Sequence, residues 1–81
     1  MLFDIGEKIR EARNSRKISQ AELAKALGMS RTTIGQIENG SVQEIGVRKL
    51  IRLLEILGLE LRVRPAGRPP TLEDLREEED R

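Results

Sequence analysis

Residues 19–40 read SQAELAKALGMSRTTIGQIENG, and this stretch contains two signals that start a helix. Ser19 opens Ser-Gln-Ala-Glu, a capping box with its glutamate three residues on. Ser30 is a second residue of the type preferred at an N-cap. Gly28 lies between them, where a helix can end in the left-handed conformation. We therefore predict two short helices, over residues 20–27 and 31–38, joined by a three-residue turn.

The apolar residues of this stretch indicate how the two helices pack. Ala24 is small, as a close crossing of two helices requires. Gly28 supplies a positive φ that a side chain would resist. Ile34 and Ile37 lie on one face of the second helix and are expected to anchor it on the core. Two short helices joined by a turn with glycine form a helix-turn-helix unit.

Further elements are expected on both sides of this unit. Helical spacing of apolar residues predicts a helix over 4–17, with Arg16 and Lys17 in its last turn, and another over 47–57. Over 59–64 the period changes to two, because Leu59, Leu61 and Val63 alternate with charged residues. This alternation indicates a half-buried strand. Alternatively, the segment is a frayed extension of the helix or a linker.

The composition excludes several classes of protein. Among its 81 residues the chain has no Cys and no His, and its only aromatic is Phe3. Disulfides, thiolate chemistry and the commonest metal ligand and general base are therefore absent. An enzyme is the least expected function, and no cofactor or metal is expected. No apolar run reaches the roughly 20 residues of a membrane span, and no secretory signal is visible, so we expect a cytoplasmic protein.

Charge divides the chain into a basic body and an acidic tail. Residues 1–70 carry 13 Lys and Arg against 8 Asp and Glu, whereas residues 71–81 carry 2 against 6. A net charge of +5 on the body suggests a polyanionic partner. The tail, with Leu72 and Leu75, is expected to form one capped turn or to stay disordered. It would either bind a protein partner or compete with DNA for the basic body.

The 19–40 stretch resembles the DNA-binding unit of the Cro and repressor family, also called the Xre family. The opening QAELA, the central Gly28 and the closing IENG stand as that family has them, and the resemblance covers residues 3–58. It implies an all-α, lambda-repressor-like bundle of four to five helices. LLEILGLELRVRP, residues 53–65, is similar in hydrophobic pattern to the end of Hip-type antitoxins, small Xre-family repressors that follow their helices with one strand.

The helix over 31–38 is the candidate reader of DNA. The residues facing away from Ile34 and Ile37 include no bulky apolar group and no acid: Arg31, Thr32, Gly35, Gln36 and Asn39. Such a helix fits the major groove, where Arg pairs with guanine, Gln with adenine, and a Thr methyl touches thymine. Ser30 and Thr33, at the start of the helix, complete the candidate set. The alternative is an ordinary solvated face.

The resemblance implies roles for residues on the neighbouring elements. Gln20 would reach a DNA phosphate and buttress the first residues of the reading helix, or else merely fill the helix start. Asn39 and Ser41 would contact phosphates, or else form a turn. Arg13 and Glu38 would form a structural pair that ties the reading helix to the first helix, or else remain two unpaired surface charges.

A lone strand leaves its backbone N–H and C=O groups unpaired. The simplest partner is the same strand of a second copy, paired antiparallel about a two-fold axis, as the resemblance to Hip-type antitoxins also implies. Leu59, Leu61 and Val63 would then form the dimer interface. Such a homodimer would read a palindromic operator with two helices about 34 Å apart.

We therefore expect a DNA-binding domain over 1–58, a dimerising strand over 59–64, and a linker with an acidic tail over 65–81. The predicted function is a transcriptional repressor, more specifically an antitoxin whose tail holds a toxin. The alternatives are a regulator without a toxin and a protein-interaction adaptor that has lost DNA binding.

Overall fold

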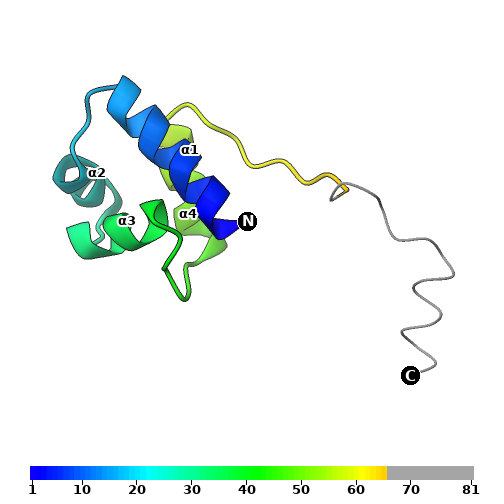
Figure 1. Cartoon of the computed structure of the whole chain (residues 1–81). Coiled ribbons are helices and arrows are strands. Elements are labelled where there is room, and N and C mark those ends of the chain that lie inside the picture. The colour runs from blue at the N-terminus through cyan, green and yellow to red at the C-terminus, as the bar shows by residue number, and fades with distance from the viewer. Residues whose placement is uncertain (66–81) are drawn as a thin grey trace, which may run out of the picture.

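Four helices form the part of the chain that the structure, a computed structural model, describes, which is residues 1–65. They are α1 (Leu2–Ser15), α2 (Gln20–Leu27), α3 (Arg31–Glu38) and α4 (Val47–Ile56). In Figure 1, α2 and α3 lie on one side of the bundle, and the chain leaves α4 toward the other side. The all-α bundle is thus confirmed. Most of the predicted linker and the whole acidic tail, residues 66–81, lie outside the described residues.

Both helices of the opening stretch begin and end where the sequence predicts. The Ser19 hydroxyl accepts a hydrogen bond from the Glu22 N–H at 3.0 Å, and the Glu22 carboxylate accepts one from the Ser19 N–H at 3.1 Å. The Ser30 hydroxyl accepts from the Thr33 N–H at 3.1 Å. Gly28 adopts φ 65°, the left-handed region, between the two helices. These local bonds satisfy N–H groups that a helix start otherwise leaves free.

The core collects one apolar stripe from every helix. Its members are nearly inaccessible to solvent: Ile9, Leu23, Ala24, Leu27, Ile34, Ile37, Val42, Leu53, Leu54 and Leu57. Each fully buried Leu or Ile contributes about 1.5–3 kcal/mol relative to exposure. All but Val42, which lies in the α3–α4 loop, belong to the apolar stripes of the predicted helices.

Gly6 allows α1 to approach α3 closely. A Cβ atom on Gly6 would collide with the backbone carbonyl groups of Ile37 and Glu38. No side chain fits at this crossing, so the glycine fixes how near α1 comes to the end of α3. The sequence analysis did not identify this contact.

The bounds predicted for α1 were wrong by two residues at each end. The Ile5 N–H donates to the Met1 carbonyl at 3.0 Å, which starts the helix before Asp4. At the other end the Ile18 N–H donates to the Arg13 carbonyl at 3.1 Å, and Lys17 takes φ 56°. This left-handed residue closes α1 at Ser15. Arg16 and Lys17 therefore lie beyond the last turn rather than in it.

The end of α4 is held by the chain beyond α1. Arg16 Nε donates to the Leu57 carbonyl at 2.9 Å, and the Leu59 N–H donates to the Leu54 carbonyl at 2.7 Å. Gly58 at φ 70° turns the chain out of the helix. Residues 59–65 then run without regular secondary structure, so no strand occurs among the described residues. A strand here needs a partner, and the strand remains a prediction.

Candidate nucleic-acid interface

The inner side of α3 is anchored by a charged network at its C-terminal end. Glu38 is only 2% exposed, and its two carboxylate oxygens accept from Arg13 Nε at 2.6 Å and from Arg13 Nη2 at 3.0 Å. Arg13 Nη1 donates to the Ile18 carbonyl at 2.8 Å. This fork-shaped pair brings together the two residues that the resemblance implied. It ties the end of α3 to α1.

Gln20 joins the same network from the start of α2. Its Nε2 donates to Glu38 Oε1 at 3.3 Å. Gln20 therefore supports the last residues of α3, and the expectation that it supports the first ones was wrong. The reason is connectivity, because the turn joins the end of α2 to the start of α3. The amide nitrogen carries two hydrogens, so one remains for an anion outside the protein.

The buried pair also determines the charge on the outer side of α3. Glu38 is the only acid of the helix, and it points inward against Arg13. The exposed side chains of α3 and its C-cap are therefore neutral or basic: Arg31, Thr32, Gln36 and Asn39. They present the guanidinium, hydroxyl and amide groups that read base edges in a major groove. This is the face that the sequence predicted, without an acid to repel a phosphate backbone.

Gly35 lies within this face and is not needed for packing. A Cβ atom there would meet only the Gln20 side-chain nitrogen, at 4.0 Å. In a helix interior Gly costs about 1 kcal/mol relative to Ala. The fold thus leaves room for a side chain at this position, and Gly35 keeps the surface beside Gln36 free of one.

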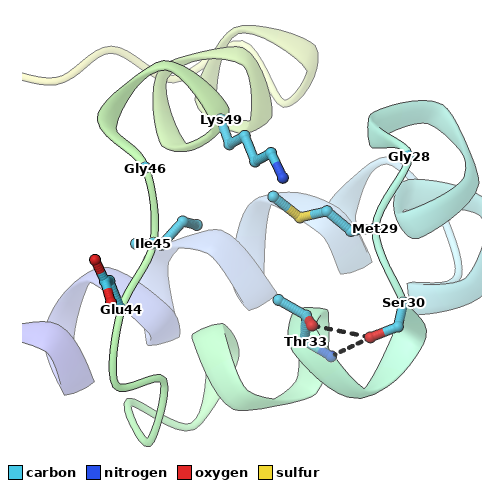
Figure 2. A pocket seen from close by; sticks show the side chains of 8 residues that line it. All are labelled: Gly28, Met29, Ser30, Thr33, Glu44, Ile45, Gly46 and Lys49. Carbon is cyan, nitrogen blue, oxygen red and sulfur yellow. Dashed lines mark hydrogen bonds between the residues drawn. The ribbon is translucent and has the colours of Figure 1, made fainter.

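Ser30 and Thr33 face a different direction from the other candidates. Their hydroxyl groups lie 2.9 Å apart and bond to each other. Figure 2 shows both beside a cleft of about 330 Å³ between the α2–α3 turn and the α3–α4 loop. Thr33 therefore lies on the flank of α3, half-buried, and not on its outer face.

Lys49 is a candidate that the sequence analysis missed. It reaches from the first turn of α4 toward Met29 and the cleft in Figure 2. The available signal was the basic pair Arg48-Lys49 just after Gly46. Because α4 has no side-chain cap at Gly46, the free N–H groups at this helix start add positive potential to the cleft that Lys49 lines.

Asn39 and Ser41 bond to each other after the end of α3. Asn39 Oδ1 accepts from the Ser41 N–H at 3.0 Å and from the Ser41 hydroxyl at 2.5 Å. This is the turn chemistry that the sequence analysis gave as the alternative to phosphate contact. Both residues are exposed, and the Asn39 amide nitrogen has no bond to another described residue.

The three residues predicted for a dimer interface differ in burial. Leu59 packs against the core, whereas Leu61 is 47% and Val63 is 96% exposed.

Among residues 1–65, no cluster of acidic side chains is arranged to hold a metal ion. The same residues contain no helix long and apolar enough to cross a membrane.

Two known proteins are similar to this chain in sequence. The ImmF control region 10 kDa protein of Bacillus phage phi105 is 39% identical over 59 residues, which are 73% of this chain and 64% of that protein. The HTH-type transcriptional regulator RamB of Mycobacterium tuberculosis is 38% identical over 56 residues, 69% of this chain but 12% of RamB. The chain thus spans less than two thirds of either relative.

A solved structure agrees with the fold over a similar length. The restriction-modification controller protein C.AhdI from Aeromonas hydrophila superposes with a TM-score of 0.65 at 29% identity, covering 73% of this chain and 88% of that one. Residues 9–63, more than half of the chain, match the helix-turn-helix family HTH_3. These residues contain the whole unit from the α2 capping box to the end of α4. The chain belongs to the helix-turn-helix family.

Proposed function

We propose that this protein is a sequence-specific DNA-binding transcription regulator that reads the major groove with α3. The observation that carries the proposal is the exposed face of α3, where Arg31, Thr32, Gln36 and Asn39 stand without an acid or a bulky apolar group. The names of its relatives agree, because one is a transcriptional regulator and one a controller protein.

Each side chain of this face has a specific task in the proposal. Arg31 donates to guanine O6 and N7, Gln36 pairs with adenine N6 and N7, and the Thr32 methyl contacts thymine. Gln20 and Asn39 use their remaining amide hydrogens on phosphate oxygens. Ser30 and Thr33, on the flank of α3, and Ser41, in the turn after it, contact the backbone of the DNA rather than its bases.

The test is a binding titration against a library of DNA sites. Arg31→Ala is expected to weaken the preferred site by about 1–3 kcal/mol and to relax the sequence preference at one position. Gln20→Ala is expected to weaken all sites to a similar degree. Arg10→Ala is the matched control, because it removes the same charge from an exposed position of α1. If Arg31→Ala and Arg10→Ala had the same effect, α3 would not be the reader.

We also propose that the protein binds palindromic DNA as a homodimer through residues 59–64. The support is the alternation of Leu61 and Val63 with charged residues, together with their exposure. The Leu61→Pro variant removes one ladder N–H and is expected to yield a folded monomer that binds one half-site weakly. A wild-type protein that sediments as a monomer at tens of micromolar would contradict this proposal.

The narrower role of antitoxin rests on the resemblance of residues 53–65 to Hip-type antitoxins. A protein encoded next to this one, if it is a toxin, is expected to be bound and inhibited by the full chain and not by a chain that ends at Pro70. A regulator without a toxin would bind DNA and lack this second activity. A protein-interaction adaptor would show no steep salt dependence of DNA binding. None of these proposed roles includes a catalytic activity.

A further inference from the structure

A large open groove lies on the side of the bundle away from α2, between α1 and residues 59–65. It has a volume of about 790 Å³. Its apolar lining comes from α1, α4 and the segment that follows α4: Met1, Ile5, Leu54, Leu59, Leu61 and Val63. Leu61 and Val63 leave much of their surface exposed in this groove. Apolar side chains that line an open groove can be covered by another segment or molecule.

Residues 60–65, which form one wall of the groove, also leave their backbone groups without partners in the described part of the chain. None of these residues donates or accepts a backbone hydrogen bond with another described residue. An extended segment with free N–H and C=O groups pairs readily with a second extended chain. The groove therefore offers both apolar contact and backbone pairing to an occupant.

The charges around the groove favour an acidic occupant. Lys8, Arg62 and Arg64 stand against Asp4 and Glu60. Glu60 already binds Arg62 at 2.6 Å and Lys8 lies 3.8 Å from Glu11, whereas Arg64 has no ion-pair partner among residues 1–65. The groove thus has a basic excess beside its apolar floor.

We propose that this groove is the docking site of the chain's own acidic tail, residues 71–81. The tail reads TLEDLREEEDR, with two leucines three residues apart and six acidic residues against two Arg. Leu72 and Leu75 enter the apolar floor, and the acidic residues face Lys8 and Arg64. The proposal does not depend on DNA binding.

The length of the chain beyond Pro65 fits this docking. Leu72 and Leu75 follow Pro65 by seven and ten residues, an extended reach of about 23 Å and 33 Å at about 3.3 Å per residue. Residues 59–65 span about 20 Å in the same units. A short tether also gives an effective concentration in the millimolar range. A second copy competes for the same residues 59–65, but at micromolar concentration it brings the same basic excess and lacks this advantage. The tail of the same chain is therefore the favoured occupant in the monomer, and a second copy has to displace it when the proposed dimer forms.

Because the chain has no cysteine, a disulfide trap tests the proposal cleanly. Lys8→Cys at the groove is combined with Asp74→Cys between the two leucines. The control combines Asp74→Cys with Lys25→Cys on α2, which lies on the other side of the bundle in Figure 1. Oxidation at about 1 μM protein, far below the tether's effective concentration, is followed by mass and by mobility without reductant.

The groove pair is expected to form its intramolecular disulfide at least about tenfold faster than the control pair. Equal rates would overturn the proposal, and so would a predominantly intermolecular product. Replacing Leu72 and Leu75 by Ser in the trap variant is expected to reduce the rate to that of the control. Val63→Ser is expected to slow the reaction as well, whereas Val47→Ser, an exposed valine outside the groove, is not. A rate unaffected by the loss of both leucines would also overturn docking. Val63 and Val47 are both exposed, so neither valine variant disturbs the buried core.

Discussion

The helix-turn-helix half of the molecule and its C-terminal end differ in how their helices are capped and in how much apolar surface they expose. In the first half, α2 and α3 each begin at a serine cap, and α3 turns its acid inward and its polar side chains outward. At the C-terminal end, α4 begins at Gly46 without a side-chain cap, and the chain continues into exposed Leu61 and Val63. The first half therefore buries its apolar and acidic side chains and leaves only polar or basic ones on the outer face of α3. The C-terminal end leaves apolar side chains exposed, and we propose above that the acidic tail covers them.

The network of Arg13, Gln20 and Glu38 joins α1 and α2 to the end of α3. Breaking it should therefore have the largest effect on stability. Arg13→Ala leaves Glu38 buried and unpaired, and it is expected to lower the free energy of unfolding by about 3–5 kcal/mol. Chemical denaturation measures this change. Arg10→Ala, which removes an exposed Arg of the same helix, is expected to cost less than about 1 kcal/mol. Equal losses for the two variants would show that the pair does not organise the fold.

A medium effect is expected from removing the cap of α3. Ser30→Ala deletes the acceptor for the Thr33 N–H and should cost about 1 kcal/mol of stability. The same variant should weaken binding to all DNA sites only slightly, because α3 keeps its outer face. Thermal unfolding and the site-library titration measure the two effects. A loss of sequence preference without a loss of stability would mean that Ser30 itself contacts a base.

The capping box of α2 should make the stability of the protein depend on pH. Hydrogen bonds from the Ser19 backbone and side chain hold the pKa of Glu22 below its ordinary value of 4.5. Because the pKa is lower in the folded state, the stabilisation is present above about pH 4.5 and is lost as pH falls through the lowered value. Glu22→Gln keeps a capping-box residue and removes the titration. Below pH 4.5 the stability advantage of the wild type over this variant should therefore shrink, as thermal unfolding across pH would measure.

The smallest effect is expected where the C-terminal half lacks a cap. Gly46 has φ −66° and ψ 138°, and a Cβ atom there would meet nothing within 4 Å. Gly46→Ser therefore adds a side-chain acceptor at the start of α4 without strain, and it should stabilise the protein by a few tenths of a kcal/mol, about the usual difference between these caps. Differential scanning calorimetry measures it. A destabilised variant would indicate that the free helix start has another use.

Features that depend on residues within four positions of one another could be predicted from the sequence. Ser19 and Ser30 set the starts of α2 and α3, and Gly28 sets the end of α2. The period of Ile34 and Ile37 indicated which side of α3 faces outward. The same reasoning placed both ends of α1 two residues too late. At the C-terminal end, nothing in the local sequence Arg16-Lys17 indicates that Lys17 adopts the left-handed conformation. Alternation at Leu59, Leu61 and Val63 indicated an extended segment but could not supply its partner.

Contacts between residues far apart in the chain arise only when the helices pack together. Arg13 and Glu38 lie 25 positions apart, and only the crossing of α1 with α3 at Gly6 brings them within 2.6 Å. The connection of α2 to α3 places Gln20 beside the end of α3, and the α3–α4 loop forms a cleft beside Thr33. The groove between α1 and residues 59–65 likewise exists only after folding. Local hydrogen bonds fix where a helix begins, whereas packing fixes which side chains share a site, because packing joins segments that the sequence separates.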